Sequence, residues 1–160
     1  MQSITVIHSG GFKEKYFEDA FAEYKKRISA LAKFEDIELP EAPLPENPGV
    51  KEVERALSIE GKRIISRLDP RAKKIALCVE GRGMSSEELA EVFRASAIDG
   101  YSKIVFVIGS SFGLSDEVKK ACDIKLSFSK MTFPHQLMRV ILSEQIYRAL
   151  SINGGGKYHK

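Results

Sequence analysis

The side chains best suited to chemistry in this 160-residue chain gather in its last third. His135, Arg139 and Arg148 fall within one stretch of helical character, and Tyr158 and His159 follow in a short basic tail. Arginine presents a planar fork of donors that matches the oxygens of a phosphate group. An imidazole, an aromatic ring and ammonium groups close together at a terminus are more typical of a contact surface than of a packed core. The usual interpretation of the two arginines is a solvated polar helix face, and contact of one of them with phosphate is the alternative.

Three further candidates are loops that each follow a predicted strand, at residues 80–84, 109–114 and 128–134. In open α/β sheets, ligands bind beyond the carboxyl ends of the strands. The first two loops contain glycine, which allows the backbone to approach a ligand closely. The sequence GSSFGL lacks the third glycine of GxGxxG and the Gly-Lys-Ser/Thr ending of a phosphate-binding loop. The three histidines show no metal-ligand spacing, so no metal is expected.

The elements that position these groups alternate along the chain. Apolar or β-branched runs predict strands, at 2–8, 34–39, 74–79, 103–108 and 124–128. Apolar residues at spacings of three and four predict helices, at 13–32, 50–68, from Ser85, from Ser115 and after Pro134. Continuous apolar strands separated by helices predict an α/β fold, a mostly parallel sheet with helices on both faces. The length predicts one domain over residues 1–160.

The long helix after Pro134 has one predicted buried face, which comprises Leu137, Met138, Ile141, Leu142, Ile146, Ala149 and Leu150. Three glycines at 154–156 end it and give the tail freedom. The four prolines within 40–49 predict a surface loop.

Composition restricts the class of partner. Hydrophobic residues make up 43% and charged residues 29%, which is typical of a globular domain. A net charge of +3 permits a polyanionic partner, although a histone-like excess of base is absent.

Cys78 and Cys122 are expected to be buried, reduced thiols. With no apolar run of membrane-spanning length and no secretion signal, the sequence predicts a cytoplasmic protein without a membrane partner.

Taken together, several segments resemble one family. They are IALCVEGRGMSSEELA at 75–90, FVIGSSFGL at 106–114, LSFSKMTFPHQLMRVILSEQIYRA at 126–149 and the closing KYHK, and residues 6–28 are similar to the family's N-terminus. The chain resembles the RlmH family, the small members of the SPOUT class of knotted methyltransferases that act on ribosomal RNA. The resemblance covers nearly the whole chain.

The resemblance implies a deep C-terminal trefoil knot, a homodimer and the cofactor S-adenosyl-L-methionine. It also implies methylation at N3 of pseudouridine 1915 in 23S ribosomal RNA. The expected cofactor-binding residues come from all three loops or the strands before them: Leu77, Gly109, Phe128, Ser129, Lys130, Met131, Thr132 and Phe133. Because one small domain of low net charge is a poor reader of long RNA, we expect a site shared between protomers and an assembled ribosome or subunit as substrate.

The reaction implied by the family suggests roles for the remaining groups. The acceptor nitrogen carries a proton that must leave near the moment of attack, so a base or a proton path is expected. His135 and His159 are the candidate bases, and Arg148 and the Tyr158–His159 pair are predicted at the acceptor base. Arg139 is predicted on phosphate or a helix end. The expected RNA contacts are the basic residues Arg139, Lys157 and Lys160.

One loop departs from the family pattern, and two alternatives stay open. The family often has Gly-Gly-x-Glu-Gly where this chain has Gly-Ser-Ser-Phe-Gly at 109–113, so no carboxylate at that position can be required here. The departure leaves open an RNA- or ribosome-binding module without catalysis. A flavodoxin-like domain that binds a small phosphate ligand is the second alternative, supported only by Ser9-Gly10-Gly11 after the first strand.

Overall fold

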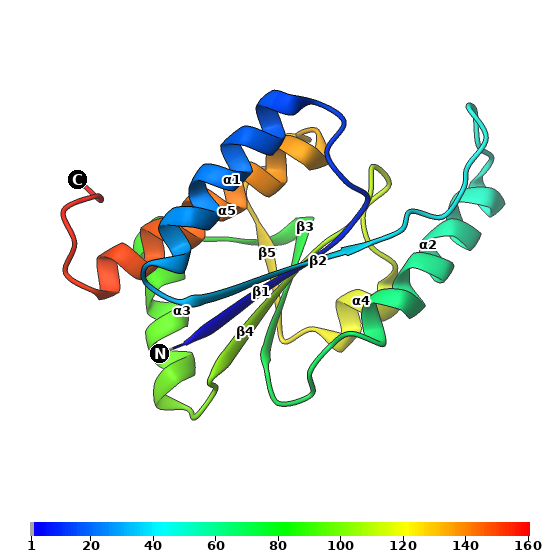
Figure 1. Cartoon of the computed structure of the whole chain (residues 1–160). Coiled ribbons are helices and arrows are strands. Elements are labelled where there is room, and N and C mark those ends of the chain that lie inside the picture. The colour runs from blue at the N-terminus through cyan, green and yellow to red at the C-terminus, as the bar shows by residue number, and fades with distance from the viewer. Residues whose placement is uncertain (1) are drawn as a thin grey trace.

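The computed structural model describes residues 2–160, and these form a single parallel sheet covered by helices (Figure 1). The strands are β1 (Ser3–Ser9), β2 (Lys33–Leu39), β3 (Lys73–Gly83), β4 (Lys103–Ile108) and β5 (Ile124–Ser127). Their order in the sheet is β2-β1-β4-β3-β5, with every pairing parallel. All carboxyl ends therefore lie at one edge of the sheet, as the predicted α/β fold requires.

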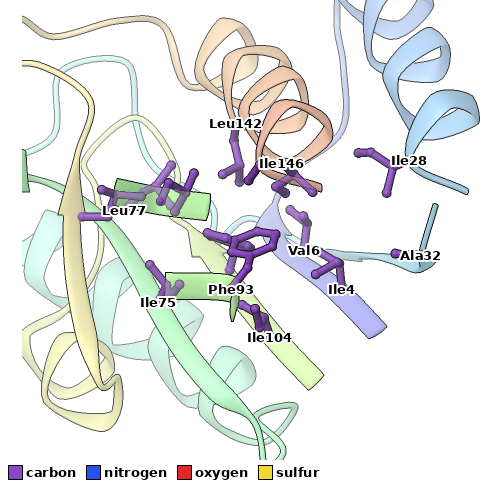
Figure 2. Packing of buried hydrophobic residues seen from close by; sticks show 14 of the residues in the cluster. Ile4, Val6, Ile28, Ala32, Ile75, Leu77, Phe93, Ile104, Leu142 and Ile146 are labelled. Atoms are coloured by element: carbon purple, nitrogen blue, oxygen red, sulfur yellow. The ribbon is translucent and has the colours of Figure 1, made fainter. Parts of the chain in front are cut away.

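The helices are α1 (Lys15–Ser29), α2 (Val50–Ile65), α3 (Ser86–Ile98), α4 (Asp116–Ala121) and α5 (His135–Asn153). Helices α1, α3 and α5 cover one face of the sheet, and α2 and α4 cover the other (Figure 1). Figure 2 shows the core of the first face, where Phe93 of α3 lies among Ile4 of β1, Ile104 of β4 and Ile146 of α5. Successive strand residues point to opposite faces of the sheet, and each face is covered by helices. The central strands are therefore buried on both sides.

Capping residues place two of the predicted helix starts. The Ser85 backbone N–H donates to Glu88 Oε2 at 2.7 Å, and Ser85 Oγ accepts from the Glu88 N–H at 3.1 Å. This is the reciprocal capping box that the spacing predicts, and it places the start of α3. Ser115 caps α4 by accepting from the Val118 N–H at 3.3 Å. Helix α2 continues through Gly61. A Cβ at this position would lie 2.5 Å from Ser115 Oγ, so glycine allows α2 to pack closely against the start of α4.

The prediction that Arg139 lies on a polar helix face is wrong. Its side chain is 1% exposed, and its guanidinium carbon lies 4.4 Å from the centre of the Phe12 ring. Positions 139, 142, 146 and 149 form the buried stripe of α5, so spacing rather than charge decides where this arginine lies. Leu142, Ile146 and Ala149 are buried as predicted.

Candidate active site

The three predicted loops meet at the carboxyl edge of the sheet and line a cavity of about 650 Å³. The lining includes residues 77–80 from β3, 108–114 after β4, and 126–129 with 131–135 after β5. Seven of the eight predicted cofactor-binding residues contribute to it: Leu77, Gly109, Phe128, Ser129, Met131, Thr132 and Phe133. Lys130 does not line the cavity and is exposed.

The first loop is a bulge within a longer strand than the sequence predicts. Strand β3 pairs with β5 through Leu77, loses register, and pairs again from Arg82. The intervening residues leave the ladder, which brings Val79 and Glu80 to the cavity. A Cβ at Gly81 would lie 2.7 Å from the Lys125 carbonyl carbon, so the backbones of the two strands approach closely at this bulge.

The second loop is a tight turn closed by its two glycines. The Gly113 N–H donates to the Ser110 carbonyl at 2.8 Å, and Gly113 has a φ of +83°. A Cβ built on Gly109 would lie 2.1 Å from the Gly113 carbonyl oxygen. No side chain fits there, so the turn depends on glycine at position 109.

The third loop is held by its own serines. Ser127 Oγ donates to the Ser129 carbonyl at 3.0 Å, and Ser129 Oγ accepts from the Met131 N–H at 3.0 Å. These bonds shape the chain between β5 and α5, and they place Phe128 and Phe133 in the cavity wall.

One ion pair supplies the charged groups among the lining side chains. Lys119 of α4 donates to the carboxylate of Glu80. This hydrogen bond lowers the pKa of Glu80 and raises the pKa of Lys119. Nothing in the sequence singled out this pair, because its members lie in a bulge and in a short helix.

His135 also lies at the cavity, at the first turn of α5. Its Nδ1 lies 3.3 Å from Ser111 Oγ, and its Nε2 lies 3.7 Å from Glu41 Oε1. Burial lowers the pKa of His135 below its ordinary 6.5, although Glu41 opposes the shift. The ring is therefore neutral at pH 7 and can accept a proton.

We expect the imidazole of His135 to titrate with a midpoint below pH 6.5. As pH falls below 6.5, the unfolded chain takes up this proton before the folded one, so the free energy of unfolding decreases in that window. NMR titration of the histidine ring protons measures the midpoint, and loss of one signal in His135→Asn assigns it. A midpoint above 6.5 would contradict the burial argument.

The other three predicted catalytic residues form a separate cluster beside the C-terminal half of α5. Arg148 Nε donates to Glu144 Oε1 at 3.0 Å, and the Tyr158 hydroxyl donates to the same oxygen at 3.0 Å. The Arg148 guanidinium carbon lies 4.6 Å from the centre of the Tyr158 ring. Burial, with the bond to Glu144, raises the pKa of Tyr158 to about 12, so this residue is a hydrogen-bond donor at neutral pH and not a base.

His159 completes the cluster in a defined tautomer. Its Nδ1 lies 3.2 Å from Arg148 Nη1, which can only donate, and its Nε2 lies 2.8 Å from Glu87 Oε1, which accepts. Nδ1 is therefore the acceptor and Nε2 carries the proton. The predicted RNA-contacting residues Lys157 and Lys160 are exposed in the same tail, whereas Arg139 is buried.

One chain does not bring all the predicted catalytic residues together. His135 and Arg148 are thirteen positions apart on α5, which at 1.5 Å per residue separates them by about 20 Å. Figure 1 shows the C-terminal tail at the far end of α5 from the helix start. The cavity and the cluster are thus two separate groups within one chain.

Comparison with known proteins identifies the family. Residues 2–159 match the family model described as "Predicted SPOUT methyltransferase". The chain is 49% identical over 158 residues to ribosomal RNA large subunit methyltransferase H of Clostridioides difficile, and 51% identical over 158 residues to the protein of that name from Bacillus cytotoxicus. Each alignment covers 99% of both chains. The chain belongs to the RlmH family of SPOUT methyltransferases.

Solved structures show the same fold at low identity. A probable methyltransferase from Bordetella pertussis aligns over 93% of this chain and 96% of its own, with a TM-score of 0.56 and 15% identity. A tRNA (m1G37) methyltransferase from Aquifex aeolicus aligns over 92% of this chain and 69% of its own, with a TM-score of 0.51 and 13% identity. Membership of the RlmH family and the strand order exclude the flavodoxin-like alternative, whose sheet runs 2-1-3-4-5.

Neither a membrane span nor a metal cluster occurs in the described part of the chain. Among residues 2–160, no helix is both long and apolar enough to cross a bilayer. Over the same range, no three His, Cys, Asp or Glu side chains are grouped to hold a metal ion.

Proposed function

We propose that this member of the RlmH family uses S-adenosylmethionine to methylate N3 of pseudouridine 1915 in 23S ribosomal RNA, on assembled ribosomes in the cytoplasm. The observation that carries the proposal is the three-loop cavity at the carboxyl edge of a SPOUT sheet, in a chain about half identical to enzymes named for methylation of large-subunit ribosomal RNA. The C-terminal knot stays a prediction.

The cavity suits the cofactor in size and character. Its volume of about 650 Å³ falls within the usual range for small-molecule sites, roughly 300–1,000 Å³. Most of the lining is apolar, which suits a nucleoside base and a thioether chain, and the Gly109–Gly113 turn is part of that lining. When bound, S-adenosylmethionine supplies an electrophilic methyl group on a sulfonium. The residues that line the cavity would hold that group in line with the acceptor, and such positioning would supply a large share of the catalysis.

The acceptor nitrogen must lose its proton, and two groups of residues suit that task. His135 is neutral and lies at the cavity, so it can accept a proton there. Arg148 carries a fixed positive charge that would stabilise a deprotonated imide, and Tyr158 and His159 are placed against it. Lys157 and Lys160 are exposed at the surface, where they can meet phosphates of the same RNA.

The separation of these two groups supports a shared site. About 20 Å lies between His135 and Arg148 in one protomer, which is too far for both to act on one base. In a homodimer with antiparallel α5 helices, the tail of one protomer would reach the cavity of the other. This arrangement joins the predicted catalytic residues in one site.

The decisive experiment is methyl transfer from labelled S-adenosylmethionine to ribosomes that lack the modification, with the product nucleoside identified by mass spectrometry. We expect N3-methylpseudouridine, with less product on free ribosomal RNA. Transfer to another nucleoside would overturn the proposed acceptor. Failure both to transfer methyl and to bind the cofactor would favour an RNA- or ribosome-binding module without catalysis.

A further inference from the structure

A buried carboxylate on α2 lies behind the second loop of the cavity. Glu60 is 4% exposed and faces no lysine, arginine or histidine within ion-pair distance among residues 2–160. Its Oε1 accepts from the Ser110 hydroxyl at 2.8 Å, and its Oε2 accepts from the Ala42 N–H at 3.3 Å. Burial of a carboxylate is unfavourable unless hydrogen bonds replace those it loses with water. The Ser110 hydroxyl and the Ala42 N–H supply such bonds.

His135 lies beside the same turn. Its Nδ1 lies 3.3 Å from Ser111 Oγ, within hydrogen-bond distance, whereas its Nε2 lies 3.7 Å from Glu41 Oε1, beyond that distance. Because the ring is neutral, the contact with Glu41 is neither a hydrogen bond nor an ion pair. Glu60 is therefore the group that connects the turn to the proline-rich segment.

The position of Ser110 determines the shape of this turn. It directly follows Gly109, lines the cavity, and supplies the carbonyl that accepts from Gly113. A bond from its side chain to Glu60 on α2 restrains the turn that lines the cavity. The proline-rich segment is restrained by the same carboxylate, so the two segments share one anchor.

We infer that Glu60 is a positioning residue of the cofactor site: it holds the 109–114 turn in its binding shape and ties it to the proline-rich segment at Ala42. This inference rests on the proposed function, because it takes the cavity to be the cofactor site. Glu60 itself does not line the cavity and has no direct contact with a ligand there. Its effect is therefore on the affinity of the site and not on the reacting atoms.

The test measures cofactor affinity and turnover separately in Glu60→Ala, Glu60→Gln and Ser110→Ala. We expect Glu60→Ala and Ser110→Ala each to raise the Kd for S-adenosylmethionine by at least about tenfold, while kcat at saturating cofactor stays within about twofold. Glu60→Gln retains one acceptor oxygen of the same shape and should recover part of the affinity. Glu54→Ala is the matched control, because it makes the same change at an exposed position of α2.

The double variant distinguishes positioning from general destabilisation. If both residues act through one hydrogen bond, Glu60→Ala combined with Ser110→Ala should raise Kd no further than the larger single change. A Kd within twofold of wild type in Ser110→Ala, or effects that multiply in the double variant, would overturn the inference while the proposed function stands. A wild-type protein that binds no S-adenosylmethionine would overturn both. Because Ser110→Ala leaves Glu60 and its bond to the Ala42 N–H in place, it tests the inference even if Glu60→Ala does not fold.

Discussion

Gly109→Ala is expected to reduce the affinity for S-adenosylmethionine by at least about 30-fold, which corresponds to about 2 kcal/mol. The added methyl group would lie 2.1 Å from the Gly113 carbonyl oxygen and 2.4 Å from its carbonyl carbon. Both atoms belong to the backbone, so the turn itself must open to admit the side chain. Isothermal titration calorimetry with the cofactor measures the loss.

A matched control is available on the neighbouring loop. A Cβ on Gly83 would meet nothing within 4 Å, so Gly83→Ala makes the same chemical change without a collision. We expect this variant to bind the cofactor as the wild type does. If Gly109→Ala also kept its affinity within about threefold, the turn would not be part of the cofactor site.

Arg148→Ala is expected to lower turnover by at least about tenfold, or roughly 1.4 kcal/mol of barrier, with cofactor affinity near normal. Its guanidinium is the cationic group of the cluster, where it pairs with Glu144 and contacts Tyr158 and His159. Its removal eliminates the charge, leaves the Glu144 carboxylate without its partner and loosens the tail. Arg148 is not among the residues that line the cavity, which is why cofactor affinity should stay near normal. Single-turnover methyl transfer with prebound cofactor measures the effect.

The control for Arg148 is another paired arginine. Arg94 on α3 forms an exposed ion pair with Glu91, at 2.6 Å, and Arg94→Ala should leave turnover unchanged. Survival of turnover within a factor of two in Arg148→Ala would assign this residue to structure alone.

Mixing the two impaired variants, at a cofactor concentration well below the Kd of Gly109→Ala, tests whether the site is shared. In a heterodimer of Gly109→Ala and Arg148→Ala subunits, one composite site carries both changes and the other carries neither. Random exchange of subunits should therefore restore about a quarter of the wild-type activity. If each site belonged to a single chain, no mixture would recover activity. Unfolding and refolding the variants together, followed by the methyl-transfer assay, makes the comparison.

Most helices and strands, and the three loops at the cavity, can be predicted from the sequence. Continuous apolar runs mark β3 and β4, and the Ser85–Glu88 spacing marks the start of α3, because these signals are local. The bulge after Leu77 was not predicted, since it depends on how β3 meets β5. Threading of a chain leaves no local pattern in a sequence, so the prediction of a knot rests on the family resemblance alone.

The site was predicted less completely than the fold. Leu77, Gly109 and the third-loop residues line the cavity because they follow neighbouring strands, whereas Lys130 lies outside its lining. Glu41 and Glu60 gave no signal, since a carboxylate in a proline-rich loop and one on a helix both look like ordinary surface residues. The charge of Arg139 predicts an exposed side chain, whereas its spacing from Leu142 and Ile146 on α5 places it on the buried face.

The strand order also determines when the molecule can fold during its synthesis. Strand β1 pairs with β2 near it in sequence, but its other neighbour is β4, and Ser3 pairs with Lys103. At about 5–20 residues per second, a ribosome needs roughly 5–20 s to produce the stretch between those partners. Until then one edge of β1 is open, and Ile4, Val6 and Ile7 lack most of their cover. The nascent chain therefore depends on completion of its second half before β1 is paired on both sides.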